Sequence, residues 1–218
     1  MSAPGDPLAA ELRRIFGAVR FLWPGAFSFA GRLVQAAVPA PGERVDPLAP
    51  PPVVLQLQHQ LYLGCYCVPF AGRPGGFPPE PADASAEREA FVQCLAEANA
   101  GRERRISGVL RPRESRRLDE DFYFAFAETP GLLEDRVRLV RLYWNVGRAA
   151  APRLVAVLTR RLNRFRLPFQ LKCLSRPRQF ERLDAAVLFV QRRHFRTVAE
   201  LLAESWPELA PGLGLRTP

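Results

Sequence analysis

The sequence predicts an α+β fold in which helices flank a mixed or antiparallel sheet. The 218 residues, 48% of them hydrophobic and 24% charged, are enough to bury a core in one domain or slightly more. In the second half of the chain, apolar residues switch between the two-residue repeat of strands and the 3.6-residue repeat of helices. The resulting order, strand–strand–helix–strand–strand–helix, is typical of α+β domains.

The first half predicts helices that are separated by proline-rich connectors. Residues 8 to about 38 begin with helical spacing and break at Pro24, and residues 39–52 form a connector. We therefore place an N-terminal helical segment and its proline-rich connector over residues 1–52. Residues 53–68 suit another helix, although the pattern also allows a strand. Residues 69–84 are rich in proline and glycine and predict a loop.

The middle of the chain predicts a helix followed by an arginine-dense stretch. Ser85 is a suitable N-cap for a helix that runs to about Asn99. Residues 101–117 carry many arginines, and we expect them to be exposed, flexible or ligand-facing.

The second half predicts strands over 121–127, 137–146, 168–174 and 183–190, with helices over 149–165 and 195–206. The strand over 137–146 alternates: one face carries apolar residues (Val140, Leu142, Trp144, Val146), and the other carries Arg141, Tyr143 and Asn145.

Composition narrows the class of function. The formal net charge is +9, yet the arginines are scattered and match no nucleic-acid-binding motif, so nucleic acid is an unlikely partner. Four cysteines and two histidines form no metal-binding spacing, and we expect neither a metal nor a cofactor. No apolar run reaches the roughly 18 residues of a membrane span. The N-terminus lacks the pattern of a signal peptide, so we expect a cytoplasmic protein.

Lys172 is the only lysine among the 31 lysine and arginine residues. It falls within the apolar run 168–174, which predicts a strand. A lysine on an apolar wall is desolvated and can lose its proton near neutral pH, whereas arginine stays charged. The position therefore gives Lys172 prominence among the basic residues. Codon usage in a GC-rich genome would also leave a single lysine, and residue statistics alone favour that explanation.

Four segments resemble the HopA-class type III effector family: Arg-Leu-Tyr-Trp-Asn at 141–145, Leu-Thr-Arg-Arg-Leu-Asn at 158–163, Pro-Phe-Gln-Leu-Lys at 168–172 and Arg-Leu-Asp-Ala-Ala-Val-Leu-Phe at 182–189. A looser similarity extends upstream to residues 60–62 and 96–101. The resemblance implies a fold related to the phosphothreonine lyase effectors, with a lyase domain over 53–218. Family members usually continue further, so we expect a C-terminally short domain.

The family also includes phospho-lyases of lanthipeptide and thioamitide pathways. There, a kinase phosphorylates Ser or Thr of a ribosomal precursor peptide, and the lyase eliminates phosphate to leave dehydroalanine or dehydrobutyrine. By position, Lys172 matches the family's base and Arg182 a phosphate-binding arginine. The face formed by Arg141, Tyr143 and Asn145 matches the strand that carries the family's acid, which is a histidine in the effectors.

Phosphate elimination needs a base for the Cα proton, cations for the phosphate and a donor for the departing oxygen. Arg141, Arg176 and Arg182 are the candidate phosphate ligands. Because the acid strand has no histidine, the donor would be Tyr143, a water held by Asn145, or another group. For Arg182, a salt bridge with Asp184 at the strand entrance is the structural alternative.

The expected partners are a phosphorylated precursor peptide and the Ser/Thr kinase of the same pathway, with a second copy of the chain as the alternative. A hypothesis from a different class is a non-catalytic HopA-like subunit that binds the kinase or the leader peptide. A third is an effector delivered into host cells, which the arginine- and leucine-rich N-terminus does not favour.

Overall fold

The computed structural model describes residues 7–22, 25–36, 50–67, 84–131 and 138–214. They belong to two compact units, Met1–Pro78 and Pro79–Pro218. This division falls later than the boundary we placed between residues 52 and 53, because the helix that follows residue 52 packs against a strand of the first unit. The predicted proline-rich connector and the predicted loop over 69–84 fall almost entirely outside the described residues.

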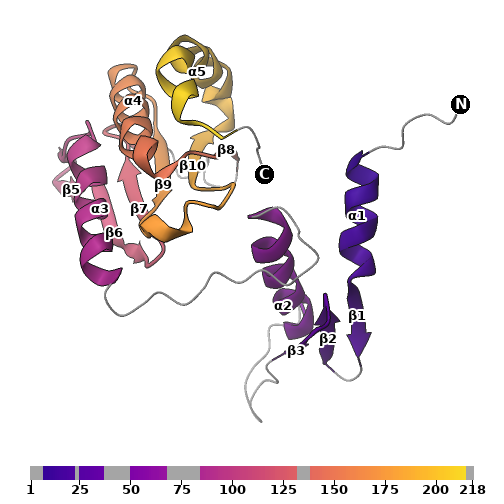
Figure 1. The fold of residues 1–218 in the computed structure, drawn as a ribbon. Helices are drawn as coiled ribbons and strands as arrows, with labels where there is room; N and C mark the ends of the chain where they lie inside the picture. Colours follow the sequence, from indigo (N-terminus) through magenta and orange to yellow (C-terminus); the bar gives the residue numbers. More distant parts are fainter. Residues whose placement is uncertain (1–6, 23–24, 37–49, 68–83, 132–137, 215–218) are drawn as a thin grey trace, which may run out of the picture. The chain divides into compact units, whose positions relative to one another are not determined.

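The first unit contains α1 (Pro7–Gly17), the strands β1 (Val19–Leu22), β2 (Ala26–Phe29) and β3 (Arg32–Gln35), α2 (Pro52–Leu61) and a π-helical turn (Tyr62–Tyr66). The strands form an antiparallel sheet in the order β1-β2-β3 (Figure 1). Phe27 and Phe29 are fully buried, and apolar residues of α1 and α2 pack against them. The helix predicted for residues 53–68 is confirmed as far as Tyr66, with its last turn π-helical.

The helix predicted from the spacing that begins at residue 8 ends at Gly17, before the break that we expected at Pro24. Beyond it, Phe27 and Phe29 alternate with exposed or half-buried residues, which is the period of a strand. Ala30 and Gly31 both have positive φ, 49° and 83°, as a two-residue hairpin turn between β2 and β3 requires. The segment after Gly17, which we had included in the N-terminal helical segment, therefore contains a β-hairpin.

The second unit is built on a five-stranded antiparallel sheet. Its strands are β6 (Glu114–Asp119), β7 (Phe122–Phe126), β8 (Leu139–Trp144), β9 (Phe169–Leu174) and β10 (Ala186–Gln191), in the order β6-β7-β9-β10-β8. The predicted α+β class with an antiparallel sheet is confirmed, as are the four strands predicted in the second half. The three inner strands, β7, β9 and β10, are the most buried, since each is paired on both sides.

Three helices cover one face of this sheet: α3 (Ala84–Ala98), α4 (Ala151–Arg164) and α5 (Phe195–Leu209) (Figure 1). Helix α4 lies between the other two, and its apolar stripe (Leu154, Val157, Leu158, Leu162) is buried as its spacing predicts. Short 3₁₀ turns lie at 148–150, 177–179, 192–194 and 210–212. Among the described residues, every helix is too short or too polar to cross a bilayer.

Two local predictions change. Helix α3 begins at Ala84, so Ser85 lies within its first turn and is not the N-cap. The arginine-dense stretch 101–117 is largely exposed, as expected, but much of it is paired in strands. It forms the hairpin of β4 (Arg104–Ile106) and β5 (Val109–Arg111) and most of β6.

Candidate functional site

Lys172 lies on the face of the large sheet opposite the helices, which we call the open face. On β9, half-buried Gln170 and Lys172 alternate with buried Leu171 and Cys173, which belong to the core that the helices cover. Strand pairing aligns Phe124, Lys172, Val187 and Tyr143 in one row across β7, β9, β10 and β8. Paired residues of adjacent strands point to the same side. Lys172 and Tyr143 therefore share the open face, about 10 Å apart between Cα atoms at the usual strand spacing.

Burial lowers the pKa of Lys172, as the apolar run predicted. Desolvation is the largest cause; Asp184 opposes it, Arg182 adds to it, and Asp119 and Tyr143 oppose it more weakly. The ammonium nitrogen lies 4.0 Å from the centre of the Phe122 ring. The Phe122 ring thus lies against the ammonium group, and the charges of one arginine and two carboxylates act on the pKa of the lysine. The two carboxylates were not part of our prediction.

Arg182 forms a bidentate ion pair with Asp184, in which Nε and Nη2 each lie 2.8 Å from a carboxylate oxygen. The pair is deeply buried, with side-chain exposures of 4% and 0%. Its guanidinium carbon also lies 5.5 Å from the centre of the Phe122 ring, the same ring that lies against the Lys172 ammonium group. The structure thus contains the salt bridge that sequence reasoning left open, and this pair occupies the fork of Arg182.

Arg141 lies one row further along the same face, opposite Phe189 and Gln170. Its guanidinium carbon is 5.8 Å from the centre of the Phe189 ring. The residue is exposed, and no carboxylate of the described residues lies within ion-pairing distance of it. Of the three predicted phosphate ligands, Arg141 is therefore the one whose charge remains available to a ligand.

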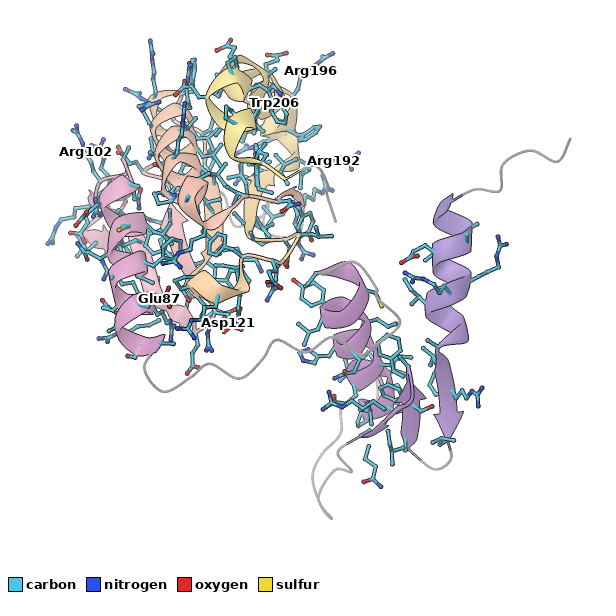
Figure 2. All side chains as sticks on the ribbon, viewed as in Figure 1. Glu87, Arg102, Asp121, Arg192, Arg196 and Trp206 are labelled. Atoms are coloured by element: carbon cyan, nitrogen blue, oxygen red, sulfur yellow. The ribbon has the colours of Figure 1, made fainter. Side chains whose placement is uncertain are left out.

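The other predicted residues lie at the margins. Arg176 follows β9 and pairs with Asp121, at 2.8 Å from Nε to Oδ1. Asp121 and Arg192 mark opposite ends of the sheet (Figure 2), because one precedes β7 and the other follows β10. Asn145 follows β8, and its carbonyl oxygen accepts a hydrogen bond of 2.7 Å from the Gly214 amide. The structure gathers Lys172 and Tyr143 in one row and places Arg176 at one end.

A cavity of about 650 Å³ lies on the open face, beginning in the row next to Lys172. Phe126, Gln170 and Phe189 form that row, and Leu118, Leu139 and Gln191 are among the residues that complete the lining. Sequence reasoning missed this cavity because its walls come from separate parts of the chain. The only local signal was that Gln170 and Phe189 share the open face with the candidate base.

The model of the HopA1 effector protein family matches residues 113–218. No curated protein matches the chain. The matched segment contains the whole five-stranded sheet, α4, α5 and all six candidate site residues, whereas residues 53–112, to which we extended the resemblance, lie outside it. The part of the chain that carries the candidate site is therefore similar to the HopA1 effector protein family, as its four sequence segments indicated.

Proposed function

We propose that this protein is a phospho-Ser/Thr lyase that converts phosphorylated residues of a ribosomal precursor peptide to dehydroalanine or dehydrobutyrine. The observation that carries the proposal is Lys172, a half-buried lysine of lowered pKa on the open face of the sheet, in one row with Tyr143. The match to the HopA1 effector protein family over the same residues supports it. Pathways of the lanthipeptide or thioamitide type are the proposed setting.

In the proposed step, neutral Lys172 removes the Cα proton of the phosphorylated residue. The electron pair of the C–H bond forms the Cα–Cβ double bond, and the Cβ–O bond breaks with release of phosphate. A proton donor to the leaving oxygen lowers the barrier. Tyr143 is the donor we propose, because it shares the row and the face of Lys172. A water held by Asn145 is the alternative. Desolvation favours this chemistry, since it increases the neutral fraction of the lysine at a given pH.

Arg141 is the proposed first ligand of the phosphate. Its guanidinium is exposed and not ion-paired within the described residues, and arginine binds phosphate oxygens in a bidentate manner. Arg182 lies near the same Phe122 ring as Lys172, but it would have to exchange Asp184 for the phosphate. Arg176 would likewise have to leave Asp121. These two arginines are therefore secondary candidates.

The decisive experiment is incubation of the protein with phosphoserine and phosphothreonine peptides, followed by mass spectrometry for the loss of phosphoric acid. We expect elimination by the wild-type protein and none by Lys172→Ala or Lys172→Arg, because arginine cannot serve as a base. The exposed substitution Val109→Glu, on the β4–β5 hairpin, is the control that should retain activity. Elimination at the wild-type rate by Lys172→Ala would refute the assignment.

The second candidate is a non-catalytic subunit that positions the kinase or the leader peptide. The observation that favours it is the buried Arg182–Asp184 pair, which occupies an arginine that the family resemblance assigns to phosphate. Size-exclusion chromatography with light scattering, with and without the pathway's kinase, tests this role. A stable complex together with no elimination from any phosphopeptide would select it. Elimination by the protein alone would exclude it.

A further inference from the structure

We infer that the 650 Å³ cavity on the open face binds an apolar side chain of the substrate peptide, two or four residues from the phosphorylated position. The inference rests on the proposed function and adds the class of peptide that the site would select. Pockets of a few hundred to about 1,000 Å³ take ligands of drug size, so the cavity has room for a short segment of peptide.

The position of the cavity sets the spacing. Its first row, Phe126–Gln170–Phe189, is two residues along the strands from the row of Lys172. Two residues of a strand span about 6.6–6.8 Å, and an extended peptide repeats its same-side residues at the same interval. The Lys172 ammonium leans the other way, toward Phe122, which adds up to one more such step. A peptide lying along the sheet with its phosphorylated residue at Lys172 would thus place the second or fourth neighbour in the cavity.

The lining chemistry indicates an apolar side chain with a polar backbone beside it. Phe126 and Phe189 supply aromatic walls, and Leu118 and Leu139 are partly exposed at the cavity although large apolar side chains gain by burial. Gln170 is half-buried in the same row, and its carboxamide makes no hydrogen bond to any described residue. A carboxamide can both donate to and accept from a peptide backbone. Arg141, the proposed phosphate ligand, lies at the end of this row, so the cavity is next to the proposed phosphate site.

The test uses peptides that bind but cannot react. Peptides containing α-methylphosphoserine lack the α-hydrogen, so the wild-type protein cannot eliminate their phosphate. A set of such alanine-rich peptides carries leucine at position −4, −2, +2 or +4, and fluorescence anisotropy gives each Kd. We expect one leucine position to lower Kd by about tenfold or more, the order expected from burial of one large apolar side chain.

Two matched variants locate the effect. Leu118 lines the cavity and Val109 lies on the β4–β5 hairpin outside it, and both are 64% exposed, so glutamate at either position should leave the fold intact. Leu118→Glu should abolish the preference for leucine, and Val109→Glu should retain it. The inference is overturned if all peptides bind within about twofold of one another, or if the preference survives Leu118→Glu.

The outcomes also separate this inference from the proposed function. Elimination from ordinary phosphoserine peptides without any leucine preference would keep the lyase and remove the cavity from substrate recognition. A Leu118-dependent preference without elimination would keep the peptide site and remove the lyase. Failure of every probe to bind would overturn the inference.

Discussion

Replacement of Arg182 by methionine should destabilise the protein strongly, because it would leave the fully buried Asp184 without its counter-charge. Removal of one partner of a buried ion pair costs about 3–5 kcal/mol. In a domain the size of the second unit, 1 kcal/mol shifts Tm by about 3–4 °C, so we expect Tm to fall by roughly 10–20 °C. This magnitude applies because the pair is bidentate at 2.8 Å and its side chains are only 4% and 0% exposed.

The measurement of Tm by thermal denaturation needs two control variants. Arg178 forms an exposed pair with Glu87, at 3.2 Å, and Arg178→Met should cost no more than about 1 kcal/mol. The double substitution Arg182→Met/Asp184→Leu removes both charges and should recover most of the loss, since apolar replacement of a buried pair is often neutral.

The deficit of Arg182→Met should also shrink as the pH falls. Without the arginine, the buried Asp184 carboxyl would have a folded-state pKa above its unfolded value, and its protonation would then favour the folded state. If Arg182→Met melts as close to wild type as Arg178→Met does, the ion pair contributes little to stability. Arg182 would then be able to exchange Asp184 for a phosphate at little cost in stability.

Three further predictions concern the proposed site. Asp119→Asn should move the acidic limb of the pH–rate profile to lower pH, because Asp119 raises the pKa of Lys172 and a lower lysine pKa keeps the base neutral at lower pH; an unmoved limb would show that Asp119 does not influence the base. Arg141→Gln should weaken calorimetric binding of phosphopeptide by about 1.5–3 kcal/mol and leave the unphosphorylated peptide unaffected; equal weakening of both would assign Arg141 to peptide packing. Tyr143→Phe should slow elimination by about 10²–10⁴-fold, measured by mass spectrometry, with Asn145→Ala as its comparison; the reverse ranking would favour the bound water.

Much of the second unit could be predicted from sequence because its patterns are regular. The alternation of Arg141 and Tyr143 with apolar neighbours placed both on the open face, and the apolar run around Lys172 indicated a desolvated lysine. In the first unit, the signal of the hairpin after Gly17 was weak: four-residue strands offer only two inward positions, Phe27 and Phe29, and their turn begins at an alanine with positive φ. Strands that short carry too little periodicity to compete with a helical reading.

The partners of the lysine were harder to foresee. Asp119, on the edge strand β6, raises the pKa of Lys172, and the cavity is lined by residues as distant in sequence as Leu118 and Gln191. Such contacts depend on strand order, which local spacing does not specify. Arg182 and Asp184 are two residues apart, so their pairing was visible as an alternative. The sequence did not show that both side chains are buried, which the structure establishes.

The strand order also has a consequence for synthesis of the chain. Among the described strands, β8 pairs only with β10, which is made last of the five. Strand β8 therefore leaves the ribosome without this partner and must wait for residue 191. Pairings between distant strands form slowly, and unpaired strands are prone to aggregate in the meantime. Tyr143 and Lys172 come into one row only when Val187 is inserted between them. A chain interrupted before β10 would thus contain both residues and lack the site.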